Sequence, residues 1–139
     1  MNRRQIIRKR YADGLPFVTV RVVILNPHTN RQTTFDQRCW VDTGFTGGVS
    51  APHFRLSEAR MIDVEPSPTT VRLAGGDRRP GHVCLAFVQR IENHDIPPPG
   101  IEIELLIRGE EPGCLGLEVL RNWVTEFDGP KQILSMYEQ

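Results

Sequence analysis

The stretch CWVDTGFTGG, residues 39–48, places an aspartate directly after an apolar run and follows it with three glycines within five positions. Residues 31–41, which lead into it, alternate polar and apolar side chains and then finish apolar, as does a strand that starts in water and ends in a core. The pattern predicts that Asp42 lies at the exit of a strand, on backbone that glycine allows to approach other segments closely. The alternative from the residues alone is that Asp42 only caps or braces a tight glycine loop.

Outward from this stretch, most of the chain consists of short apolar runs separated by Pro, Gly and Asn turn signals. Two segments have weak helical spacing, residues 51–62 and Leu117 to about Asn122. The runs that predict strands are Phe17–Leu25, 31–41, Thr70–Leu73, His82–Ile91, Ile101–Ile107, 123–127 and 132–137. Many short strands with at most two short helices predict an all-β, barrel-like domain.

The composition predicts one domain without a strongly charged partner. A chain of 139 residues that is 39% hydrophobic can bury one core. Its 17 basic and 17 acidic residues cancel, so we expect neither nucleic acid nor a membrane as a partner. Residues 1–16 form a basic N-terminal extension before a domain that spans residues 17–139. We interpret the extension as a solvated or partly ordered tail, with a nucleic-acid arm as the alternative.

Cysteine usage and hydropathy bear on the compartment. The sequence has no segment of membrane-spanning length, and its first residues lack the apolar stretch of a secretory signal. Cys39, Cys84 and Cys114 are odd in number and lack metal-type spacing, which predicts buried, reduced thiols. Both observations predict a reducing, cytoplasmic location.

Spacing argues against several other kinds of site. The four histidines are scattered and no H-E-x-x-H motif occurs, so we expect no metal. The run GGVSAP approaches the nucleophile elbow G-x-S-x-G around Ser50, but Pro52 replaces the last glycine. The glycines of GFTGG do not form a phosphate-binding loop, and we expect no cofactor.

Three motifs in order resemble one protein family. VDTGFTGG, with Asp42-Thr43-Gly44, resembles the active-site loop of retroviral-type (retropepsin-like) aspartic proteases. CLGLEVLRNWVTEFD is similar to the family's later pattern of two apolar residues and a glycine, followed by a short helix and a strand pair, and it places Leu115 and Gly116 there. VRLAGGDRRPG lies between these motifs, where the family carries its flap. The resemblance covers roughly residues 17–137.

The resemblance implies a retropepsin-like closed barrel subunit with a flap hairpin and one or two short helices. It implies that Asp42 is catalytic and that Thr43 and Gly44 shape its loop, the Thr43 hydroxyl crossing to the partner loop. Leu115 and Gly116 would pack beneath that loop. The implied flap runs from residue 74 to residue 81, with the residues Ala74, Gly75, Gly76, Asp77 and Gly81.

The implied chemistry needs two carboxylates that share one proton, because like charges in contact cannot both ionise. This sequence contains a single D-T-G. We therefore expect a homodimeric aspartic endopeptidase that hydrolyses peptide or protein substrates with a water activated between two Asp42 carboxylates, one per subunit. The alternative is a protease-like dimeric module that binds peptides or mediates association without cleaving them.

Overall fold

The hairpin that leads to Asp42 consists of β2 (Phe17–Leu25) and β3 (Gln32–Val41). In the computed structural model, which describes residues 3–12 and 14–139, the two strands pair antiparallel, with Phe17 opposite Trp40 and Leu25 opposite Gln32. Burial alternates along β3, so Phe35, Gln37 and Cys39 face the interior while the intervening residues 34, 36 and 38 are exposed. Both strands confirm the sequence prediction.

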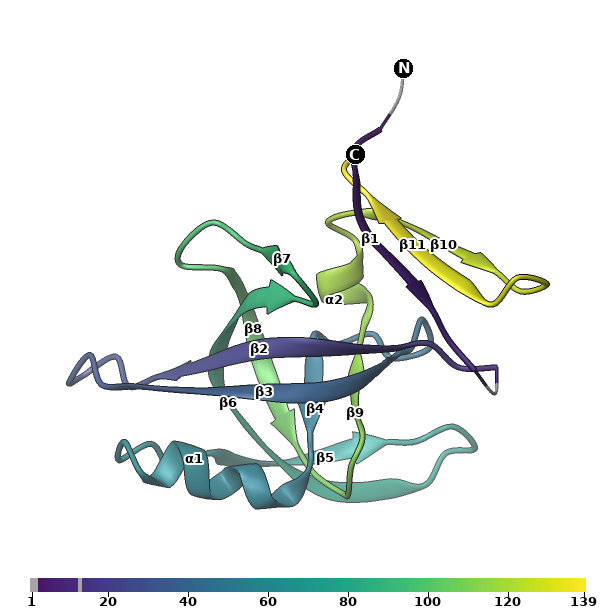
Figure 1. The fold of residues 1–139 in the computed structure, drawn as a ribbon. Helices are drawn as coiled ribbons and strands as arrows, with labels where there is room; N and C mark the ends of the chain where they lie inside the picture. The colour runs from purple at the N-terminus through teal and green to yellow at the C-terminus, as the bar shows by residue number, and fades with distance from the viewer. Residues whose placement is uncertain (1–2, 13) are drawn as a thin grey trace.

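The main sheet closes into a barrel of six strands. Its order is β2, β3, β9 (Gly113–Leu115), β4 (Val49–Ala51), β8 (Ile101–Ile107) and β6 (Arg78–Ile91), and β6 pairs back to β2. Figure 1 shows these strands wrapped around one interior. The apolar side of each strand fills it, which is the main stabilising term of such a domain. Fully buried core residues include Val18, Val20, Val22, Ile24, Val88, Leu105 and Ile107.

Both predicted helical segments are helical, and both are short. After β4 the chain forms η1 (His53–Arg55) and α1 (Leu56–Arg60), and α1 buries Leu56 and Ala59. After β9 it forms α2 (Leu117–Leu120), which buries Val119 and Leu120. In the described residues no helix is long and apolar enough to cross a lipid bilayer.

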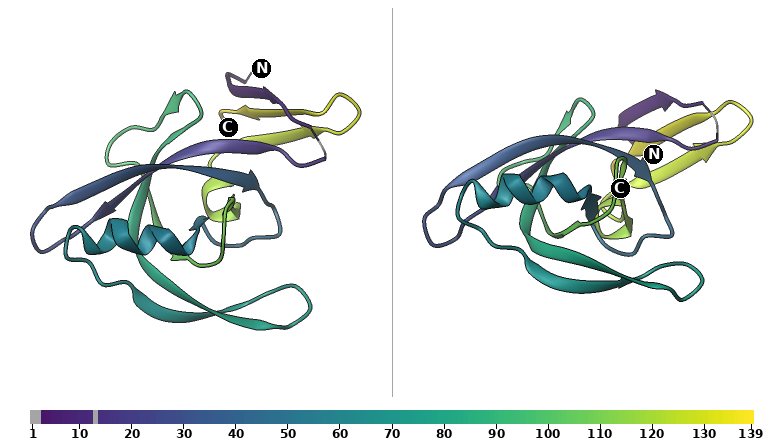
Figure 2. Two further views of the ribbon diagram at one scale, coloured as in Figure 1. Left: turned by 60° about the horizontal axis from the view of Figure 1, so that its bottom comes forward. Right: turned by 90° about the horizontal axis from the view of Figure 1, so that it is seen from below.

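A separate three-stranded sheet contains residues 5–10 of the N-terminal extension, so this part of the segment expected as a solvated or partly ordered tail is a strand. β1 (Gln5–Arg10) pairs with β11 (Ile133–Tyr137), and β11 pairs with β10 (Val124–Asp128) in the predicted C-terminal hairpin. Figures 1 and 2 show this sheet beside the barrel, with the first and the last strand, β1 and β11, side by side in it. Ile7 is the reason that the basic segment docks, because its side chain is only 6% exposed and belongs to the core cluster.

Some strands were not predicted from the sequence, because they are too short to show an alternation of polar and apolar residues. β4 and β9 have three residues each, and β7 (His94–Asp95) has two. β5 (Ser67–Arg72) and β6 form the predicted central hairpin, but β6 begins at Arg78 rather than near His82. The residues from Arg78 to Gly81 are therefore paired with β5 and do not form a loop.

Docking of β1 predicts a stability difference between two neighbouring substitutions. Ile7→Ala should lower the free energy of unfolding by about 2–4 kcal/mol, because it removes a buried side chain and leaves a cavity. Arg8→Ala, on the exposed side of the same strand, should change the free energy of unfolding by less than about 0.5 kcal/mol. Urea unfolding of both variants measures the difference. Equal midpoints would mean that β1 is not docked in solution.

Candidate active site

Asp42 lies where β3 ends, as the sequence predicted, and backbone hydrogen bonds fix its position. Its N–H donates to the carbonyl of Leu115 over 2.9 Å, and this bond belongs to the last parallel pair of β3 with β9, Val41 with Leu115. The N–H of Phe45 donates to the carbonyl of Asp42 over 3.2 Å and closes a turn around Thr43 and Gly44. The side chain of Asp42 is half-buried at the barrel's edge.

The carboxylate of Asp42 is oriented by its own loop. The N–H of Gly44 donates to Asp42 Oδ1 over 2.9 Å, and Asp42 Oδ2 takes no part in this hydrogen bond. A Cβ at Gly44 would lie 3.2 Å from the same oxygen, so a side chain there would crowd the carboxylate. Thr43 is exposed beside it. In the described part of the chain the Asp42 side chain has no ion-pair partner.

The start of α2 holds the glycine-rich loop from beneath. The first N–H groups of a helix have no partner within the helix, and here three consecutive amides donate to carbonyls of the loop. The N–H of Gly116 reaches Gly48 over 2.8 Å, that of Leu117 reaches Phe45 over 2.9 Å, and that of Glu118 reaches Gly47 over 3.1 Å. The loop and the helix start thus satisfy each other's backbone groups.

Gly116 is required by this arrangement. A Cβ at Gly116 would lie 2.3 Å from the carbonyl oxygen of Gly47 and 2.6 Å from that of Phe45, far inside contact distance. Leu115 beside it is fully buried and pairs with Val41. The structure therefore brings Leu115 and Gly116 against the loop of Asp42, Thr43 and Gly44.

Cys114 is a site residue that the sequence reasoning classed only as a buried thiol. Burial raises the pKa of the Cys114 thiol, and the negative charge of nearby Asp42 raises this pKa further. The N–H of Cys114 donates to Ser50 Oγ over 3.0 Å, so Ser50 braces β9 rather than acting as an exposed nucleophile. The position of Cys114, two residues before Gly116, was the available signal for its place beside Asp42. All three cysteines are free thiols.

The central hairpin carries the residues assigned to a flap, and they fall into two groups. Ala74, Gly75, Gly76 and Asp77 form the exposed turn, where the N–H of Leu73 donates to the carbonyl of Asp77 over 2.7 Å. Gly75 and Gly76 have φ angles of +91° and +92°, which side chains rarely adopt. Gly81 differs from the expectation, because it is buried within β6 opposite Thr69.

The hairpin turn and the Asp42 loop are not joined by any described hydrogen bond or ion pair. Figures 1 and 2 nevertheless show the tip of the hairpin on the same side of the barrel as the end of β3. Within residues 3–12 and 14–139, no cluster of His, Cys, Asp or Glu is arranged to hold a metal ion. The site therefore offers one oriented carboxylate per chain, which can accept or donate a proton.

Comparison of the chain with family models, with curated proteins and with solved structures found no match.

The contact beneath the loop predicts different effects of adding one methyl group at two glycines. Gly116→Ala should lower the free energy of unfolding by about 1–3 kcal/mol or more, because backbone oxygens occupy the space of the new Cβ. Gly129→Ala is the matched control, because a Cβ there would meet nothing within 4 Å. Thermal and urea unfolding of both variants provide the measurement. If Gly116→Ala unfolds like the control, the loop does not rest on this residue.

Proposed function

We propose that this chain is a homodimeric aspartic endopeptidase in which Asp42 of each subunit supplies one of two catalytic carboxylates. The observation that carries the proposal is the oriented Asp42 carboxylate at the end of β3, bonded to the Gly44 amide on a loop supported by α2. An aspartate that is only solvated at the surface does not require the close backbone contacts that α2 makes with the Asp42 loop. The match of D-T-G to the retropepsin-like motif adds to this support.

Two carboxylates in contact can share a single proton, since both cannot remain ionised at that distance. In the proposed reaction the charged carboxylate takes a proton from a water molecule held between the two Asp42 side chains. The oxygen of that water attacks the carbonyl carbon of the substrate peptide, and the protonated carboxyl gives its proton to the carbonyl oxygen. Collapse of the tetrahedral intermediate then breaks the C–N bond with proton transfer to the amine. No bond forms between enzyme and substrate.

In this mechanism the second carboxylate comes from another copy, because the chain has one D-T-G. A two-fold axis that passes beside the Asp42 loop delivers the partner's carboxylate by symmetry. Thr43, exposed at the same turn, would lie at that axis, where its hydroxyl can hydrogen-bond to the partner loop.

The hairpin of β5 and β6 is the segment proposed to cover the bound substrate. Two observations support this role: its glycine turn is exposed, and it extends on the side of the barrel where β3 ends. The positive φ angles of Gly75 and Gly76 give a narrow turn without side chains, which allows close approach to a peptide. Phe45, which follows the D-T-G, stands where better-known retroviral enzymes carry a small residue, so the nearby pocket should accept different side chains.

The central test is Asp42→Asn, because the amide preserves the shape of the carboxylate and its bond from Gly44 but cannot share the proton. Cleavage of a mixed peptide library, read by mass spectrometry between acidic and neutral pH, should fall by at least about 100-fold. Sedimentation should show the same dimer as for the wild type.

The matched control is Asp63→Asn, which changes an exposed carboxylate after α1. Its φ of +60° is one that asparagine tolerates, so the fold should not change. This variant should cleave like the wild type. Cleavage retained by Asp42→Asn would exclude the mechanism. Peptide binding by the wild type without any cleavage would instead favour the non-catalytic module.

Oligomeric state and chemistry are linked, because each chain contributes one carboxylate. When wild-type protein is mixed with a ninefold excess of Asp42→Asn subunits and allowed to exchange, random pairing leaves about one tenth of wild-type chains in wild-type dimers. Activity per wild-type chain should fall about tenfold, whereas the same excess of an unrelated protein should have no effect. Unchanged activity after complete exchange would place the second acid within the same chain.

A further inference from the structure

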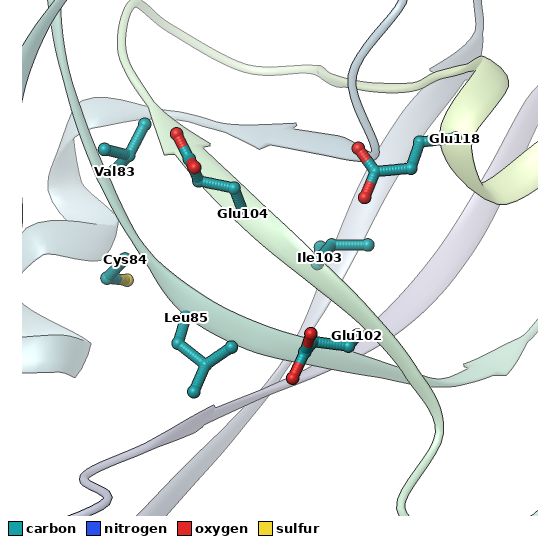
Figure 3. Close-up of a pocket in the computed structure, with 7 residues that line it drawn as sticks. All are labelled: Val83, Cys84, Leu85, Glu102, Ile103, Glu104 and Glu118. Carbon is teal, nitrogen blue, oxygen red and sulfur yellow. The ribbon is translucent and has the colours of Figure 1, made fainter.

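A groove lies beside α2 on the outer surface of β6 and β8. Its volume is about 450 Å³, and Figure 3 shows the side chains that surround it. The residues that matter for the argument are Val83, Leu85, Glu102, Ile103, Glu104 and Glu118. We call this feature the acidic groove.

The pleat of the barrel explains why carboxylates line it. Leu85 on β6 stands opposite Glu104 on β8, and directly opposed residues in an antiparallel pair share a face. Glu102 lies two residues away on the same strand, hence on the same face, while Ile103 between them is buried. Leu85 is 37% exposed, a high value for a leucine in the middle of a paired strand. The face therefore offers apolar surface next to two carboxylates.

Glu118 completes the groove from the other side. In Figure 3 its side chain reaches from α2 toward β8, where Glu102 and Glu104 project. Among the residues that the structure describes, none of these three carboxylates takes part in an ion pair. No described cluster is arranged to hold a metal ion, so the three charges are spread along the groove instead of converging on one point.

The backbone of β8 adds a second feature to the groove. β4 pairs with β8 only at Leu106 and Ile107, whereas β6 pairs along the whole strand from Ile101 to Ile107. In the described structure, residues 101–105 therefore have a strand neighbour on one side only. An unpaired strand edge can accept an extended peptide through main-chain hydrogen bonds, with side-chain pockets selecting the sequence.

We propose that the acidic groove binds an extended segment of a partner protein in which Lys or Arg alternates with apolar residues. In such a strand, side chains two positions apart project on the same face about 6.6 Å from each other, which is also the spacing of Glu102 and Glu104 along β8. The basic side chains would meet these carboxylates and Glu118. Because successive side chains of a strand alternate between its two faces, the apolar side chains would lie on the opposite face from these carboxylates, the face of β8 to which Ile103 belongs.

The acidic groove adjoins the Asp42 loop. The amide of Glu118 donates to the carbonyl of Gly47, and a Cβ at Gly48 would lie 2.6 Å from Ile103 Cγ2. A basic segment held in the groove would thus lie near the proposed catalytic loop. Binding itself does not depend on cleavage, so the two proposals can fail separately.

Binding is tested with a fluorescent eight-residue peptide that alternates Lys and Val, and with a control peptide in which every Lys is replaced by Glu. The protein is the Asp42→Asn variant of the 139-residue chain, so that cleavage plays no part. Fluorescence anisotropy at low salt should show saturable binding of the basic peptide only. Amide hydrogen exchange of residues 101–105 should slow when that peptide is bound.

Glu102→Gln with Glu104→Gln removes two charges from the groove and preserves side-chain size. This double variant should weaken binding by about 3- to 10-fold, as expected for the loss of two partly exposed ion pairs. Glu110→Gln with Glu111→Gln makes the same charge change at exposed residues of the β8–β9 connection, outside the groove, and should leave the affinity unchanged.

Three results of the binding measurements would each overturn the proposal: no binding of the basic peptide, equal binding of the acidic peptide, or equal weakening by both double variants. Unchanged hydrogen exchange at residues 101–105 in the saturated complex would also overturn it, because the peptide would then bind elsewhere. None of these results bears on whether the wild-type protein cleaves peptides.

Discussion

The approach of Gly116 to the carbonyl oxygens of Phe45 and Gly47 is the contact on which the candidate site depends. Side chains are excluded there, since a Cβ would lie 2.3 Å from an oxygen. Only at this separation can the amides of residues 116–118 reach the loop carbonyls. The close contact therefore provides hydrogen-bond partners for the amides of the helix start and for the carbonyls of the loop. The orientation of Asp42 follows, because its loop has no other described backbone support except the bond to Leu115 and its own turn.

This contact in turn requires strand pairing between distant parts of the chain. β9 contributes only residues 113–115, yet it pairs with β3 on one side and β4 on the other, and it joins segments about seventy residues apart. Closing a loop of that length costs conformational entropy that the few hydrogen bonds of a three-residue strand do not offset. Burial of apolar side chains, among them Leu115, Val41 and Val49, supplies the compensating free energy.

α2 links the two surfaces for which we propose functions. Its first amides support the Asp42 loop, while the side chain of Glu118 faces the acidic groove. The helix has only four residues, so we expect that a shift of α2 at the acidic groove also moves its amides at the Asp42 loop. Suppose that α2 can occupy two positions. A ligand in the groove would then change the support of the Asp42 loop only if it binds the protein more tightly with α2 in one position than in the other.

The sequence by itself determined the long strands, both short helices and the strand-end position of Asp42, because a regular period or a turn signal marks each of them. The close contact at Gly116 was also predictable, from its motif. Tertiary structure alone decided the three-residue strands β4 and β9, since three residues show no period, and the docking of β1, where burial of Ile7 outweighs a basic composition. It also decided the gathering of Glu118 with Glu102 and Glu104, because this depends on which segments pack together and not on any local pattern.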